Sequence, residues 1–155
     1  MTSDIVEDDE MLYRRIPTGC HYTVANGKVQ FSTSAFNSPE LKPSVDRAKL
    51  RESARQTKID PTDGVASLIT VGVRAITSVE NLEANGMRGA PPKYLIDVIA
   101  RPIPMDQISQ IENLAHAQIE SHPEILTGSR FKKLKEALAR LATERGWLIE
   151  PTGVP

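Results

Sequence analysis

Val29–Phe36 reads VQFSTSAF and joins the densest run of β-forming residues in the chain to three consecutive small hydroxyls. Ser44–Arg47, reading SVDR, follows after a loop that contains two prolines. The β-formers predict a strand. The hydroxyl run at its end predicts an ordinary turn or the lining of a polar pocket, because hydroxyls both donate and accept hydrogen bonds. We therefore expect a fold organised around a sheet, with a polar surface near the end of this strand.

Length and composition place the chain among single-domain soluble proteins. Its 155 residues suffice for one domain, which buries about 68–70% of the surface of its unfolded chain. The formal net charge of −1 disfavours a dedicated nucleic-acid or membrane-surface protein. No apolar run approaches the roughly 20 residues of a membrane span. Cys20 is the only cysteine, so no internal disulfide forms and we expect a cytoplasmic protein.

The two ends of the chain are expected to lie outside the folded core. Residues 1–10 carry five acids and no base, and they lack the basic and apolar regions of a signal peptide. We predict a disordered acidic leader here, with an acidic tether for a basic partner as the alternative. Residues 11–150 form the single predicted α+β domain, and residues 151–155 are a predicted flexible tail.

Five segments are predicted to be strands of a mostly antiparallel sheet. Asn26-Gly27 predicts a tight hairpin turn before the second of them, because both positions tolerate positive φ. The apolar run 65–76 is interpreted as a strand bent at Gly72, with a helix as the alternative. The predicted strands are 11–16, 28–34, 65–73, 94–100 and 114–119.

The strongest helix signal covers residues 129–145. Apolar residues recur there at intervals of three and four, between a capping Thr127-Gly128-Ser129 and a terminal Gly146. The fold class is thus α+β: a small, mostly antiparallel sheet with a C-terminal amphipathic helix packed on one face. The predicted buried stripe of the helix consists of Phe131, Leu134, Leu138 and Leu141.

Three weaker helical signals precede this helix. Asp46 has the residue type of an N-cap for a short helix over 47–56. The irregular stretch 77–92, punctuated by glycine and proline, is predicted to include a helical turn near 79–84. Residues 106–113 are a further predicted helical turn, and a continuation of it as a helix is the alternative to a strand at 114–119.

Polar residues on or beside the predicted strands define a candidate binding site. Arg14 and Arg15 are neighbours in a strand, so they point to opposite faces, and the inward one needs a carboxylate or an anion. We expect the site residues to form a hydrogen-bonded network or to line an open pocket. Cys20 and His21 are not expected to be a catalytic pair, because sequence neighbours do not usually face each other. The candidate binding residues are Arg14, Arg15, Ser32, Ser34, Asp46 and His116.

The sequence contains no motif for a cofactor or a metal. It lacks the glycine patterns of nucleotide-binding loops, and its three histidines are too scattered to nominate a metal site. We therefore expect no cofactor and no metal, and we assign no catalytic residue. The basic face of 130–145 is interpreted as solvated, with a weak nucleic-acid patch as the alternative.

Scattered blocks of the sequence resemble a family of short bacterial proteins that has no established activity. In that family the Ala-His-Ala element forms a strand, which favours a strand at 114–119. The resemblance implies a bacterial, cytosolic protein. The blocks that carry it are Leu12–Ile16, Ala35-Phe36, Ser44–Asp46, Gly64–Ala66, Ala115–Ala117 and Gly146-Trp147.

A second resemblance is to ADP-ribosyltransferases of the Arg…Ser-Thr-Ser…Glu type. Arg14 or Arg15, followed by Phe31–Ser34, matches the first two parts of that pattern. The arginine and the hydroxyls stand closer together in this sequence than that fold places them. Gln118-Ile119-Glu120 has the residue types of the third part.

Three functions are compatible with these observations. We expect first a non-enzymatic bacterial accessory or adaptor domain that binds a protein partner, because catalytic constellations are missing and the leader is acidic. The alternative is a small enzyme or toxin that acts on a nucleotide or NAD through the candidate site. The third is a weak nucleic-acid binder that uses the basic helix. We expect no membrane partner, and the sequence leaves the oligomeric state open.

Overall fold

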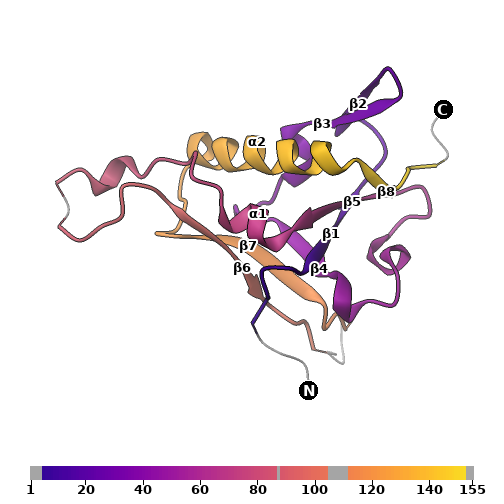
Figure 1. Ribbon diagram of the computed structural model, residues 1–155, viewed down its shortest axis with the longest axis horizontal. Helices are drawn as coiled ribbons and strands as arrows, with labels where there is room; N and C mark the ends of the chain where they lie inside the picture. The colour runs from indigo at the N-terminus through magenta and orange to yellow at the C-terminus, as the bar shows by residue number, and fades with distance from the viewer. Residues whose placement is uncertain (1–4, 87, 105–111, 153–155) are drawn as a thin grey trace.

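The computed structural model describes residues 5–86, 88–104 and 112–152, and its centre is a six-stranded antiparallel sheet (Figure 1). All strand pairs in this sheet are antiparallel, which confirms the predicted fold class. In spatial order the strands are β6 (Leu95–Ala100), β7 (His116–His122), β4 (Ser44–Arg47), β1 (Met11–Ile16), β5 (Gly64–Ile69) and β8 (Trp147–Ile149).

A separate hairpin is formed by β2 (Tyr22–Ala25) and β3 (Lys28–Phe31). Asn26 and Gly27 connect the two strands with φ angles of 54° and 75°, as their sequence predicted. The predicted strand 28–34 ends at Phe31, because the hydroxyl run turns into the short 3₁₀ helix η1 (Thr33–Phe36). This turn carries the chain from the hairpin toward β4.

Helix α2 (Gly128–Arg145) covers one face of the sheet and contacts η1, β3 and β5 (Figure 1). The Thr127 hydroxyl accepts a hydrogen bond from the Arg130 amide, and Gly146 ends the helix with a φ of 73°. The predicted stripe faces the core: three of its residues are buried and the fourth is partly buried, in the order Phe131, Leu134, Leu138 and Leu141.

Register places polar side chains from three neighbouring strands on one face. Tyr13 of β1 lies opposite Asp46 of β4, and Asp46 lies opposite His116 of β7. Directly opposed residues share a face of an antiparallel sheet, so these three side chains form a row across it. Leu12 and Ile16 of β1 point to the other face and are fully buried.

Residues 47–56 do not form the predicted helix. Strand β4 runs through Arg47, and two 3₁₀ turns follow, η2 (Ala48–Leu50) and η3 (Ala54–Thr57). Asp46 is paired within the sheet, and its carboxylate accepts hydrogen bonds from side chains instead of capping a helix.

The apolar run 65–76 combines both of its predicted alternatives. It begins as β5 and continues after Ile69 as the helical turn α1 (Thr70–Arg74). The amides of Thr70 and Val71 donate to the carbonyls of Glu10 and Asp8. The pairing of β5 with β1 ends just before these bonds, at Ile69.

Three further predictions concern segments outside the main sheet. Residues 77–86 and 88–92 belong to a loop that projects from the body (Figure 1). It contains the 3₁₀ turn η4 (Leu82–Ala84), and the Glu80–Lys93 bridge ties its base. The predicted turn at 106–113 lies largely outside the described residues. Part of the predicted flexible tail is held, since the Thr152 amide donates to the carbonyl of Thr62.

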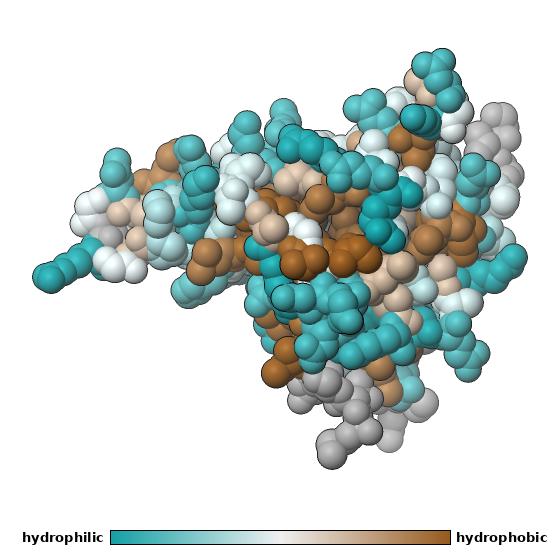
Figure 2. Space-filling model, in the orientation of Figure 1, coloured by the Kyte–Doolittle hydropathy of each residue, from teal (hydrophilic) through white to brown (hydrophobic). Residues whose placement is uncertain are grey.

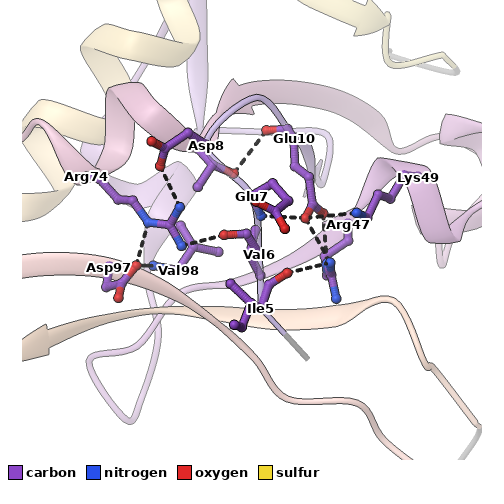
Figure 3. A network of polar contacts seen from close by, with 11 residues as sticks. Ile5, Val6, Glu7, Asp8, Glu10, Arg47, Lys49, Arg74, Asp97 and Val98 are labelled. Carbon is purple, nitrogen blue, oxygen red and sulfur yellow. Dashed lines mark hydrogen bonds and ion pairs between the residues drawn. The ribbon is translucent and has the colours of Figure 1, made fainter. Parts of the chain in front are cut away.

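The prediction of a disordered leader is wrong for the part that the structure describes. Residues 5–10, here called the N-terminal strap, lie against the body, where Val6 and Glu10 are only 1% and 5% exposed (Figure 3). Glu10 accepts two hydrogen bonds of 2.8 Å from the buried guanidinium of Arg47. Arg74 donates to Asp8 on the strap and to Asp97 on β6. The acids of the strap thus pair with bases of the body, which the sequence order alone did not show.

The face shown in Figure 2 carries apolar side chains along its middle, between α2 and the lower strands, with hydrophilic residues around them. Among the described residues, no helix combines the length and the apolar character that crossing a bilayer requires.

The α2 stripe should contribute strongly to stability. Leu138 is fully buried, and Leu138→Ala is expected to lower the free energy of unfolding by about 2–5 kcal/mol in chemical denaturation. Leu126→Ala is the control, because this side chain is 78% exposed and its loss should cost under about 0.5 kcal/mol. Equal effects of the two changes would show that α2 is peripheral to the core.

The strap should make stability depend on acid pH. Burial raises the pKa of Glu10, but hydrogen bonds from Arg47 and the Glu7 amide, with the charges of Arg47 and Lys49, outweigh it and hold that pKa below 4.5. Because the folded pKa lies below the unfolded one, the stabilisation is complete above about pH 4.5 and disappears as the pH falls through the folded pKa.

Glu10→Gln removes the carboxylate and leaves Arg47 buried without its partner. We expect a loss of about 3–5 kcal/mol at pH 7 and a flatter acid limb of the stability profile. Glu7→Gln is the matched control, since Glu7 is exposed and should change neither. An unaltered unfolding midpoint in Glu10→Gln would contradict the docked strap.

Candidate functional site

A cleft of about 810 Å³ lies beside the ends of β1 and β4, and most of the predicted site residues line it. This candidate site is called the β1–β4 cleft. Ser32 is the one predicted residue that does not line it. The five that do are Arg14, Arg15, Ser34, Asp46 and His116.

A second hollow of about 770 Å³ lies between β3, the end of α2 and β8. Its floor includes Trp147, whose ring contacts Tyr22 and Phe31 edge-on at centroid distances of 5.0 and 4.8 Å. None of the predicted binding residues lines this hollow. Its aromatic contacts join the hairpin to the main sheet.

Arg14 is held by backbone carbonyls and by no carboxylate of the described residues. Its Nε donates to the carbonyl of Ala35 at 3.0 Å, while Nη1 and Nη2 donate to those of Ser44 and Asn37 at 2.8 and 3.1 Å. The guanidinium also lies over the Phe36 ring, 5.5 Å from its centroid. Three of its five N–H groups are therefore engaged, and the hydrogen-bond partners that the described residues supply to it are all uncharged.

The surroundings of Arg14 disfavour its positive charge. Burial, and then the neighbouring charge of Arg15, lowers the pKa of Arg14 to about 10. The side chain is still a cation at neutral pH, but that cation is less well solvated than in water. An anion placed beside it would stabilise the cation and so oppose this lowering of the pKa.

Arg15 points to the other face of the sheet, as expected, and it forms an ion pair with a carboxylate of the chain. Its Nη1 donates to Oδ2 of the buried Asp63 at 3.4 Å. The same oxygen accepts from the amides of Ile59 and Asp60, so Asp63 holds the turn before β5. Of the two adjacent arginines, Arg14 is the one without a carboxylate.

Asp46 is fully committed to a hydrogen-bonded network. Its Oδ2 accepts from the Thr57 hydroxyl at 2.7 Å and from the Arg51 guanidinium at 3.1 and 3.2 Å. Its Oδ1 accepts from the Asn113 amide at 2.9 Å. These bonds tie β4 to η3 and to the segment before β7, and Asp46 is part of the lining of the cleft.

His116 connects β7 to the two segments beside it. Its Nδ1 lies 2.8 Å from the carbonyl of Arg101, which can only accept, so Nδ1 carries a proton. Its Nε2 lies 3.2 Å from the Ser44 hydroxyl, and in the neutral ring it accepts from that group. Ser44 therefore joins His116 through its side chain and Arg14 through its carbonyl.

Sequence reasoning missed the partner of Ser34. The Ser34 hydroxyl lies 3.0 Å from Nδ1 of His21 and 3.5 Å from the carbonyl of Cys20. Both Ser34 and His21 line the β1–β4 cleft. His21 thus faces a hydroxyl 13 residues away rather than its neighbour Cys20. The hairpin signal places His21 opposite Ser32, whose amide donates to the His21 carbonyl, but it does not place Ser34.

The other candidate surfaces have less support. Three bases of α2 are engaged with the body: Arg130 with Glu83, Lys135 with Asn37, and Arg145 with Ser67. Glu120, from the ADP-ribosyltransferase-like pattern, does not line the cleft and pairs with Arg101. Within residues 5–86, 88–104 and 112–152, no group of three or more potential ligand side chains is placed to hold a metal ion.

Comparison with known proteins gives no relative from which a function could be transferred. The chain matches no family model, no curated protein sequence and no solved structure. The resemblances noted in the sequence therefore stay predictions, and the function has to be argued from the cleft itself.

His116→Ala is expected to lower stability modestly, by about 1 kcal/mol, because it leaves the Ser44 hydroxyl and the Arg101 carbonyl without this partner. Thermal denaturation measures the effect. His122→Ala serves as the control, since His122 is exposed at the far end of the same strand. If both variants unfold at the wild-type midpoint, His116 is not part of the network that supports the cleft.

Proposed function

We propose that this protein is a binding domain whose β1–β4 cleft takes the carboxylate or phosphate group of a small molecule. The observation that carries the proposal is Arg14, a half-buried guanidinium at the cleft that has no carboxylate among the described residues. A charge in that position is stabilised by an anion, and within the described residues Arg14 forms no ion pair.

The geometry of Arg14 suits this role. Carbonyls of Ala35, Ser44 and Asn37 fix the plane of the guanidinium, so little side-chain freedom is lost when a ligand binds. Two N–H groups, one on each terminal nitrogen, are left for the ligand. Free N–H groups on both terminal nitrogens can donate to the two oxygens of a carboxylate or phosphate.

The rest of the lining supports an anionic ligand. Lys58 also lines the cleft and forms no ion pair within the described part of the chain, so it is a second cation there without a carboxylate partner. The acidic side chain of Glu112, which is exposed, lines the cleft as well. Hydroxyl, amide and imidazole groups supply further donors and acceptors. The volume of about 810 Å³ falls in the range of small-molecule sites. The proposal keeps the expected binding role but replaces the protein partner with a small ligand.

Inorganic phosphate is the simplest probe. Titration of the wild-type protein, followed by calorimetry and by the thermal midpoint, should show saturable binding when sodium chloride keeps the ionic strength constant. Binding should raise the midpoint, because the anion binds only the folded state. Arg14→Gln should abolish binding, and Arg14→Lys should weaken it by losing the paired donors.

Arg140→Gln is the matched control for loss of one positive charge, because Arg140 is exposed on α2 and away from the cleft. If Arg140→Gln binds phosphate with wild-type affinity while Arg14→Gln does not bind it, the loss is specific to Arg14. Equal loss in both variants, or saturable binding in folded Arg14→Gln, would contradict the proposal.

A further inference from the structure

Ser34 and His21 have the spacing of a serine nucleophile and its base. A serine hydroxyl becomes reactive when a base within hydrogen-bond reach accepts its proton, and the two atoms here are 3.0 Å apart. The hydroxyl is also 3.5 Å from the Cys20 carbonyl, at the limit of a hydrogen bond. Because the Cys20 carbonyl can only accept, both contacts form together when Nδ1 of His21 donates to the Ser34 oxygen. The reactive arrangement, in which Ser34 donates to Nδ1, keeps only the shorter contact.

Local structure holds both residues in place. His21 directly precedes β2, and its carbonyl accepts from the Ser32 amide at 2.9 Å. Ser34 lies in η1, where its own carbonyl accepts from the Asn37 amide at 3.2 Å. The neck of the hairpin and the turn after it therefore face each other at fixed positions.

The same turn surrounds Arg14. Ala35 and Asn37, which lie one and three residues after Ser34, provide two of the three carbonyls that bind the guanidinium. A ligand whose anionic group sits on Arg14 therefore lies beside the turn that carries the hydroxyl. The cleft brings together a nucleophile, a base and an anchor for charge, which the chemistry of acyl transfer uses.

We propose that Ser34 is a nucleophile and His21 its general base, acting on esters that carry a carboxylate or phosphate; this rests on the proposed anion site at Arg14. The Ser34 oxygen forms a bond to the acyl carbon while Nδ1 of His21 takes the hydroxyl proton. The ester C–O bond then breaks, and the alcohol leaves with the proton from His21. Water, activated by the same imidazole, releases the carboxylic acid and restores the serine.

Phenylmethylsulfonyl fluoride tests the nucleophile without knowledge of the substrate. Its reaction forms a bond between the serine oxygen and sulfur, breaks the S–F bond and releases fluoride, while the proton passes to His21. Intact mass spectrometry followed by peptide mapping should show one adduct, on Ser34. Ser34→Ala should remove it, whereas Ser32→Ala should keep it, because Ser32 belongs to the same hydroxyl run but does not line the cleft.

The role of His21 is tested by rate. His21→Ala should slow labelling roughly 10²-fold or more, and free imidazole should restore part of the rate, which a merely structural loss would not allow. Circular dichroism and thermal midpoints establish that the variants are folded. Unchanged labelling in folded His21→Ala would overturn the assignment of the base.

Phosphate separates this inference from the proposed function. If both hold, phosphate slows labelling of the wild type and has no effect on labelling of Arg14→Gln. Phosphate binding without any adduct on Ser34 would overturn the nucleophile and leave the anion site standing. An adduct on Ser34 in a protein that binds no phosphate would overturn the anion site and, with it, the proposed preference for anionic esters.

Discussion

The buried ion pair between Glu10 and Arg47 is the contact on which the arrangement of the sheet depends. Arg47 is 1% exposed and ends β4, and both oxygens of Glu10 accept from it at 2.8 Å. The carbonyl of Glu10 also accepts from the amide and the hydroxyl of Thr70, where β5 turns into α1. One residue of the strap therefore fixes the ends of two strands. Since β4 carries Ser44 and Asp46, the same contact helps to position the β1–β4 cleft.

Arg47 and Arg14 both face inward, but the groups around their charges differ. Arg47 has a carboxylate, a strap carbonyl and almost no solvent around it, so its charge is compensated within the chain. Arg14 has three carbonyls and an aromatic ring, and the pKa of its guanidinium is lowered to about 10. The first arrangement stabilises a fold. The second leaves Arg14 without a carboxylate among the described residues, which is the basis of the anion site that we propose there.

Local signals predicted the parts of the fold that local energetics decide. The Asn26-Gly27 turn and the capped, amphipathic α2 are specified by neighbouring residues, and both were predicted. The strap was not, because Glu10 pairs with a residue 37 positions away and the acidic composition suggested solvation.

The difference between local signals and long-range contacts also explains which features of the cleft could be predicted from the sequence. Alternation along β1 predicted that one of two arginines would face inward, and five of the six predicted residues line one cleft. The partner of Ser34 was missed because it depends on how the hairpin neck folds back against η1. Tertiary contacts also decide the different surroundings of Asp46 and Arg14. Asp46 accepts hydrogen bonds from side chains of three other residues, whereas Arg14 has no carboxylate among the described residues.

The most direct test of the central claim is to observe the guanidinium itself. Two-dimensional ¹H–¹⁵N spectra of the arginine Nε groups, recorded during a phosphate titration at constant ionic strength, report on each side chain separately. The anion site predicts a saturable shift of the Arg14 signal while that of Arg140 stays in place. Shifts confined to exposed arginines, with the Arg14 signal unmoved at saturating phosphate, would contradict it.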